Sequence, residues 1–195
     1  MSSSMIEIFG PEDFKEIPWK NGKGTTLELA ISEGDTVQSF DWRISIAQVE
    51  EDGPFSDFTG YQRTLVVLEG NGIILEHAIG HSQKLSGDLP FADFDGSWQT
   101  HGKLIDGPIT DFNIVTKSHR YQARLHTYKT PSKVDILQER FCFAYSHRTT
   151  LTLRQGIGED EYSLPAGHLL KIEDPSAGEW SLSGECFILI YLSGL

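Results

Sequence analysis

The stretch RTLVVLEGNGIIL, residues 63 to 75, decides the fold class of this chain. Two short runs rich in β-branched and aliphatic residues flank EGNG, and this pattern is typical of two β-strands joined by a tight turn. Asn71 and Gly72 can both accept positive φ, so we expect a hairpin at this point. The segment RQGIGEDEY, residues 154 to 162, indicates a second hairpin.

Strand signals also dominate the rest of the chain. Short β-branched or aromatic segments recur between turns: 25–32, 40–49, 63–70, 72–77, 111–118, 121–128, 140–146, 149–155, 168–174 and 185–192. Helix candidates are only PEDFKEI (11–17) and SKVDILQER (132–140), one to two turns long. The second lacks a 3.6-residue apolar stripe, and we interpret it as a connector between two β lobes.

The two halves of the chain show an approximate internal repeat, which we call the internal echo. In each half, a strand, a Gly-rich turn and a returning strand precede a further turn and strand. The first half has this pattern in RTLVVLEGNGIIL followed by KLSGDLPFADFDG (84–96), and the second half has it in TTLTLRQGIGEDEY (149–162) followed by SLPAGHLLKIEDP (163–175). Many short strands with regular turns favour a sandwich or barrel, and the echo indicates two jelly-roll units in tandem. We therefore predict an all-β fold for the 195 residues.

Charge and composition narrow the classes of partner. With 16 basic and 28 acidic residues, the formal charge of −12 disfavours nucleic acid, yet a few local cations can still bind a small anion. The first residues lack a secretory signal, and CFILIYL is too short to span a membrane, so we expect a cytoplasmic protein without membrane contact. Cys142 and Cys186 have apolar neighbours, which favours buried thiols over a disulfide.

Motifs for phosphate, metal and nucleophilic chemistry are weak. NGKGTT (21–26) lacks the GxxxxGK[ST] spacing of a phosphate loop, and a strand follows it. The seven histidines form no HxH pair, and we interpret His77 and His81 as surface residues, so we expect no metal and no cofactor. No G-x-S-x-G elbow occurs, although a histidine and a carboxylate distant in sequence can still form a general base.

A set of polar residues lies within the expected strands. Strand alternation places Arg43 on the face opposite Trp42, and it places Asp111 and Asn113 together on one face. Arg63 lies in a third segment of this kind. Such residues either form a solvated face or, in a barrel, line an interior that holds a ligand or a satisfied network.

Three separated segments carry a resemblance to a known family. PWKNGKGTTLELA (18–30), FDWRISIAQVEEDGPFSDFTGYQRTLVVLEG (40–70) and LIDGPITDFNIVT (104–116) together resemble the HutD/Ves family of bacterial bicupin proteins associated with histidine utilisation. The resemblance implies two tandem cupin-like jelly-roll β-barrels in one compact chain, with lobes near 1–130 and 131–195 that exchange strands. Lys23 departs from the family pattern P-W-K-N-G-G-G.

The resemblance implies a non-catalytic protein that senses or buffers an acidic intermediate of histidine catabolism, of formylglutamate or urocanate type. The matching positions are the candidate ligand-binding residues: Trp19, Lys20, Asn21, Gly22, Thr25, Arg43, Phe55, Arg63, Asp111 and Asn113. Arginine suits a carboxylate because its planar fork donates two parallel hydrogen bonds. We expect Trp19 and the adjacent loop to form the rim of such a site.

Two other functions stay open at this level. The chain could be a metal-independent cupin isomerase or hydrolase that uses a histidine and carboxylate pair on a small carboxylic acid. It could also be an interaction module that binds a protein through its acidic surface or a sheet edge. A homodimer formed through an edge strand is compatible with each of these functions.

Overall fold

The computed structural model describes residues 5–19, 24–32, 39–156, 160–175 and 179–195. These residues form strands and turns without an α-helix, which confirms the all-β prediction. Within these ranges, no helix has the length and apolar character needed to cross a bilayer.

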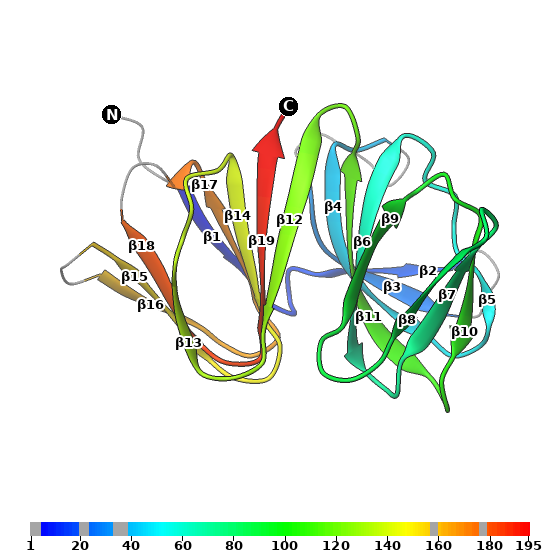
Figure 1. Ribbon diagram of the computed structural model, residues 1–195. Helices are drawn as coiled ribbons and strands as arrows, with labels where there is room; N and C mark the ends of the chain where they lie inside the picture. Colours follow the sequence, from blue (N-terminus) through cyan, green and yellow to red (C-terminus); the bar gives the residue numbers. More distant parts are fainter. Residues whose placement is uncertain (1–4, 20–23, 33–38, 157–159, 176–178) are drawn as a thin grey trace. The chain divides into compact units, whose positions relative to one another are not determined.

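The chain divides into two compact units, which we call the first and the second unit. The first unit is Phe14–Tyr121, and the second is Gln122–Leu195 together with the start of the chain up to Asp13. The first strand of the chain consequently pairs within the second unit, whereas the next strand pairs within the first unit (Figure 1).

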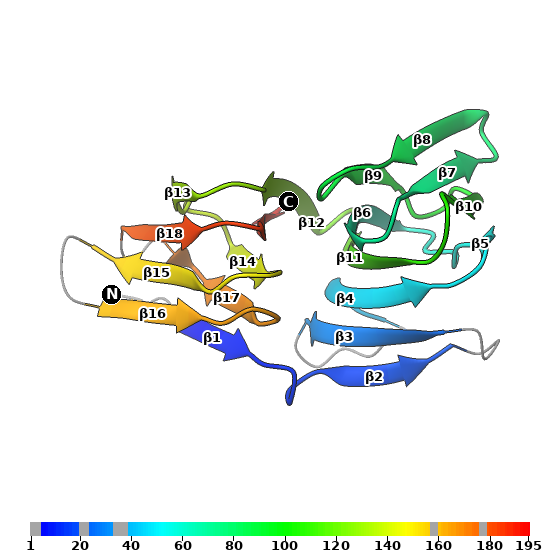
Figure 2. The same ribbon diagram turned by 90° about the horizontal axis from the view of Figure 1, so that it is seen from below.

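The first unit contains a six-stranded and a four-stranded sheet. In sheet order, the larger comprises β2 (Lys15–Pro18), β3 (Thr25–Ile31), β4 (Trp42–Val49), β11 (Ile109–Lys117), β6 (Tyr61–Glu69) and β9 (Phe91–Asp95). The smaller comprises β5 (Gly53–Pro54), β10 (Thr100–Leu104), β7 (Ile73–His77) and β8 (His81–Leu85). Leu65 and Val67 of β6 pack with Ile73 and Leu75 of β7, so a shared apolar core joins the two sheets. Figure 2 shows β2, β3, β4 and β11 following one another across the larger sheet.

The EGNG turn is a corner between sheets, not the predicted hairpin. β6 pairs with β11 and β9, whereas β7 pairs with β10 and β8. Positive φ belongs to Gly70 (95°) and Gly72 (121°), not to Asn71. A Cβ on Gly72 would lie 2.1 Å from the carbonyl oxygen of Leu85, so this corner requires glycine for space as well as for φ.

The second unit has a five-stranded and a four-stranded sheet. In sheet order, the larger comprises β1 (Met5–Phe9), β17 (Leu169–Glu173), β14 (Phe141–Ser146), β19 (Phe187–Gly194) and β12 (Tyr121–Tyr128). The smaller comprises β13 (Ser132–Asp135), β18 (Trp180–Gly184), β15 (Leu151–Gln155) and β16 (Asp160–Leu164). β15 and β16 form the predicted hairpin, with Gln155 opposite Asp160.

Two details of the second unit differ from the sequence analysis or refine it. The segment interpreted as a connector supplies strand β13, which pairs with β18 inside the unit, so that interpretation is wrong. Both cysteines are free thiols, but only Cys142 is fully buried, and Cys186 is half-buried. Burial raises the pKa of the Cys142 thiol far above its usual value, as expected for an unreactive core residue.

Candidate functional site

The polar strand residues of the first unit share the face of the larger sheet that packs on the core. In an antiparallel pair, residues directly opposite each other point to the same side. Asn113 lies opposite Leu65, and Asp111 lies opposite Val67, and both apolar partners belong to the core between the sheets. Asp111 and Asn113 therefore point inward, from the central strand β11.

The two candidate arginines lie on this same inner face. Val115 of β11 is opposite Arg43 of β4 on one side and opposite Arg63 of β6 on the other. Their Cα atoms are thus two strand spacings apart, roughly 10 Å. Alternation predicted only that Asp111 and Asn113 share one face and that Arg43 lies opposite Trp42, and it left open whether these faces are solvated. The observed register places all three residues on the inner face.

Arg63 is buried, with 6% of its surface exposed. Its Nη2 donates to Oδ1 of Asn113 at 3.2 Å, and its Nη1 donates to the carbonyl oxygen of Ser56 at 3.3 Å. Its Nε has no hydrogen-bond partner in the described part of the chain. A buried donor without an acceptor costs about 1–3 kcal/mol, so this nitrogen is an unusual feature of the interior.

Three aromatic rings surround the guanidinium of Arg63. Its Cζ lies 5.2 Å from the ring centroid of Phe55 and 5.1 Å from those of Phe58 and Phe94. These cation–π contacts partly replace water around the charge, although burial still lowers the pKa of Arg63 to about 10. Arg63 therefore stays protonated at neutral pH.

Asp111 is the acidic member of the same network, and it is 1% exposed. Its Oδ1 accepts a hydrogen bond from Nδ2 of Asn113 at 2.6 Å. Burial raises the pKa of Asp111 to about 7, and the charge of Arg63, the Asn113 bond and a backbone bond from Ala47 oppose that rise. The Asn113 amide thus bridges the two charged groups, with its oxygen toward Arg63 and its nitrogen toward Asp111.

Arg43 has an acidic partner on the neighbouring strand. Its Nε lies 2.7 Å from Oε2 of Glu28, and the two side chains are 12% and 10% exposed. Glu28 is opposite Ser45, so it also points to the inner face, and a bulge follows it in β3. The inner face therefore carries a polar row that crosses β3, β4, β11 and β6.

Trp19 was expected to form the rim of the site, and its described contacts are with its own hairpin. Its Nε1 donates to Oγ1 of Thr26 at 2.8 Å, and its ring covers Gly24, where a Cβ would lie 3.1 Å from ring carbons. Thr26 is opposite Ala47 on the inner face, so alternation turns the candidate Thr25 to the other face. The candidates Lys20, Asn21 and Gly22 lie outside the described residues.

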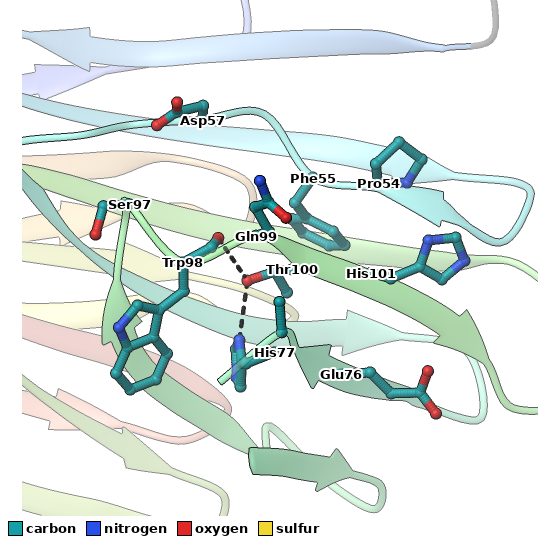
Figure 3. Close-up of a pocket in the computed structure, with 11 residues that line it drawn as sticks. Pro54, Phe55, Asp57, Glu76, His77, Ser97, Trp98, Gln99, Thr100 and His101 are labelled. Carbon is teal, nitrogen blue, oxygen red and sulfur yellow. Dashed lines mark hydrogen bonds between the residues drawn. The ribbon is translucent and has the colours of Figure 1, made fainter. Parts of the chain in front are cut away.

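A separate hollow of about 640 Å³ opens where β7 ends and β10 begins (Figure 3). Its lining residues are Pro54, Phe55, Asp57, Glu76, His77, Ala78, Ser97, Trp98, Gln99, Thr100 and His101. Of the candidate residues that the structure describes, only Phe55 lines this hollow, and Phe55 is also one of the three rings around Arg63. Sequence reasoning missed the other members of this lining.

His77 is buried, so the prediction of a surface histidine is wrong for it. Its Nδ1 lies 2.9 Å from Oγ1 of Thr100, and its Nε2 lies 3.0 Å from Oε1 of Gln83. The alternation of GIILEH contained the signal, because Ile73, Leu75 and His77 share one face of β7. Within the described ranges, no group of three or more His, Cys, Asp or Glu residues could hold a metal ion.

Comparison with known proteins identifies the family. The HutD family model matches residues 11–190. A Pseudomonas putida protein described as a 21.2 kDa protein in the hutC 3′ region is 40% identical over 67% of this chain and 68% of its own length. Protein Ves of Escherichia fergusonii is 35% identical over 58% of this chain and 60% of its own length.

Solved structures agree over nearly the whole chain. HutD from Pseudomonas fluorescens SBW25, solved in a formate condition, is 30% identical, with a TM-score of 0.83 over 98% of this chain and all of that one. A protein of unknown function from Pseudomonas aeruginosa PAO1 is 31% identical, with a TM-score of 0.87 over 97% and 99%. The Escherichia coli pirin YhhW, solved with nickel(II), shares only the cupin-like fold, at 12% identity and a TM-score of 0.62 over 97% and 99%. This all-β, cupin-like chain belongs to the HutD family.

Proposed function

We propose that the protein binds a small carboxylic acid, without catalysis, on the inner face of the first unit. The observation that carries this proposal is the buried Nε of Arg63, which lacks an acceptor in the described part of the chain. A guanidinium has five N–H donors, and the protein contacts of Arg63 use one on each of its two Nη atoms. A carboxylate that accepts from Nε and an adjacent Nη would complete the fork.

The magnitudes fit a binding protein of moderate affinity. A hydrogen bond to a charged group contributes about 1.5–3 kcal/mol, and aromatic walls such as Phe55 add apolar contact. Two such bonds with an aromatic wall reach roughly −8 kcal/mol, which corresponds to a micromolar Kd. The acidic surface of the chain does not prevent this, because charges farther than about 8 Å are screened at physiological salt.

The ligand class follows from the family and not from the geometry. The Pseudomonas putida relative is described by its place beside hutC, which supports an acidic intermediate of histidine catabolism, of formylglutamate or urocanate type. In this proposal the protein senses or buffers that intermediate and so modulates histidine utilisation. It does so in the cytoplasm.

The finer architecture belongs to the same proposal. Each unit has one larger sheet and one four-stranded sheet, as expected for two cupin-like barrels in a bicupin. The inner face of the first barrel would then be the ligand site. The bulge in β3 after Glu28 fits this arrangement, because bulges are common at barrel rims and binding sites.

Thermal unfolding with N-formylglutamate and with urocanate tests the function. Ligand at 100 times its Kd adds about 2.7 kcal/mol, which raises the Tm of a chain this long by roughly 5–10 °C. Arg63→Lys keeps the charge but loses the fork, so its affinity should fall about 10–100-fold. Arg154→Lys, at an exposed ion pair in the second unit, is the matched control. No shift with either acid at millimolar concentration would refute the proposal.

A second candidate is a metal-independent isomerase or hydrolase acting on a small carboxylic acid. The hollow favours it, because His77 and His101 line that hollow beside Asp57 and Glu76. Of these two histidines, His101 is exposed, whereas His77 is buried and both of its ring nitrogens are hydrogen-bonded. Product formation from the same acids that disappears in His101→Ala would support this candidate, and absence of turnover in the wild type would exclude it for those acids.

A further inference from the structure

The proposed site contains two buried opposite charges before any ligand binds. Arg63 and Asp111 both lie on the inner face, and the amide of Asn113 bridges them. Their charges sum to zero when both are ionised. A carboxylate that binds beside Arg63 would therefore leave one uncompensated negative charge in a site of low dielectric constant, which is strongly unfavourable.

Among the residues that the structure describes, the neighbouring strands do not supply another cation for this charge. On β4, Arg43 faces the same side, but Glu28 of β3 already pairs with it at 2.7 Å. On the facing sheet, the titratable side chain that points into the described interior is His77. Its ring centroid lies 5.2 Å from that of Phe94, and both of its nitrogens are hydrogen-bonded. Within the described ranges, Asp111 is thus the group placed to neutralise the excess charge.

We propose that a carboxylate binds beside Arg63 together with one proton from solvent, and that Asp111 takes up this proton. The inference rests on the function proposed above, and it adds the charge rule of the site. The ligand stays a carboxylate, the Asp111 carboxylate becomes a carboxylic acid, and no other bond changes. The occupancy of the site therefore depends on both the concentration of the acid and the pH.

The pKa of Asp111, raised to about 7 by burial, fits this role. If the complex holds Asp111 protonated, proton uptake is roughly 0.1 at pH 6, 0.5 at pH 7 and 0.9 at pH 8, from the fraction that is ionised before binding. The affinity should then be roughly 30-fold weaker at pH 8.5 than at pH 6 by the same linkage. Arg63 does not contribute to this slope, because its pKa of about 10 lies above the range.

Titration calorimetry of the full-length wild type with N-formylglutamate measures the uptake directly. This probe has no group that titrates between about pH 6 and 8.5, because its carboxyl groups have ordinary pKa values near 4. Binding heats at pH 8 in two buffers with different protonation enthalpies give the number of protons. A value close to 0.9 is expected, and a value near zero overturns the inference without any mutant.

Two variants assign the proton to a residue. Asp111→Asn removes the titrating group at constant shape, and its affinity should change less than about twofold between pH 6 and 8.5. Asp88→Asn, an exposed acid in the same unit, is the matched control and should keep the wild-type slope. A slope in Asp111→Asn equal to that of the wild type would assign the proton elsewhere and overturn the inference.

The failure of the function and the failure of the inference give different results. If the wild type binds no N-formylglutamate at any pH, the proposed function fails for this probe and the inference fails with it. If the wild type binds with the same affinity at pH 6 and 8.5, the function stands and the inference is wrong. A circular dichroism melt of Asp111→Asn shows whether that variant is folded, and the two-buffer experiment decides the question if it is not.

Discussion

The central strands of the two units carry opposite chemistry on their inner faces. In the first unit, β11 points Asp111 and Asn113 into the interior. In the second unit, β14 points Cys142 and Ala144 into a core that also includes Leu189. Both strands are central in the larger sheet of their unit, and both units have a four-stranded second sheet.

The difference shows that this strand framework does not need charged groups in the core between its two sheets, since the buried Lys171 of the second unit lies outside that core and pairs with Glu7. The second unit has an apolar core around β14, and apolar burial contributes about 25 cal/mol per Å². Replacing a buried charge network by apolar residues is often neutral or stabilising, so the Arg63 network is poorly explained by stability. Polar groups that weaken a core are expected where a protein performs its function.

The contrast between the two interiors would be wrong if the second unit tolerated a polar group in its core. Leu189→Asn keeps the side-chain size, loses the apolar burial and leaves an amide without partners. The free energy of unfolding should fall by about 3–5 kcal/mol, measured by urea denaturation. Leu195→Asn, at a position 74% exposed, should change it by less than about 0.5 kcal/mol. A loss below about 1 kcal/mol at Leu189 would show that the two interiors are equivalent.

The converse change removes the bridge of the first unit. Asn113→Leu deprives Nη2 of Arg63 of its acceptor and Oδ1 of Asp111 of its donor. Breaking a buried network while leaving its charges costs about 3 kcal/mol, which urea denaturation at pH 8 measures.

The triple variant Arg63→Met, Asp111→Leu and Asn113→Leu sharpens this result. Without charges to satisfy, its stability should return to within about 1 kcal/mol of the wild type or exceed it. Binding of N-formylglutamate should be lost. A triple variant less stable than Asn113→Leu would mean that the network is needed for folding.

A smaller effect, the pH dependence of the free energy of unfolding, is expected from Asp111 in the first unit. An acid whose folded pKa is raised to about 7 stabilises the folded state fully below its unfolded value near 3.8, and this stabilisation is lost as pH rises to 7. Between pH 5 and 8 the wild type should lose about 2–3 kcal/mol relative to Asp111→Asn. Urea midpoints of the two proteins, with Asp88→Asn as control, measure this difference. Parallel curves would show that Asp111 titrates normally.

The sequence predicted the fold class because short β-branched segments carry their periodicity locally. It failed at EGNG, since a turn between paired strands and a corner between two sheets use the same glycines at positions 70 and 72. The distinction depends on what lies beside each strand, here β11 and β10, and those contacts are distant in sequence. Strand β13 was missed for the same reason, because only its pairing with β18 makes it a strand.

The candidate site was predictable as far as alternation extends. Period-two reasoning placed Asp111 and Asn113 on one face, and the structure adds Arg43 and Arg63 through the register around Val115. The partner of Arg43 was not predictable, because the bulge after Glu28 shifts the register of β3. Whether these residues bind a ligand stays a prediction.

The smallest expected effect concerns a part-buried hydrogen bond between Trp19 and Thr26 in the first unit. Nε1 of Trp19 donates to Oγ1 of Thr26, which points to the same inner face as the charged row. Trp19→Phe and Thr26→Val each remove one half of this bond, and a half-buried hydrogen bond contributes about 0.5–1.5 kcal/mol. The double-mutant cycle should give a coupling energy of about 1 kcal/mol by urea denaturation.

That coupling energy tests whether some polar residues of the first unit stabilise the fold while others bind the ligand. The Trp19 bond is fully paired and joins two strands of one hairpin, so it should stabilise the unit and leave ligand affinity within about threefold of the wild type. The Arg63 network should show the reverse pattern, with large effects on affinity and little net stabilisation when all three residues are replaced. If Trp19→Phe instead weakens binding of N-formylglutamate as much as Arg63→Lys does, the rim of the site extends to Trp19, and the inner face acts as one continuous surface from β2 to β6.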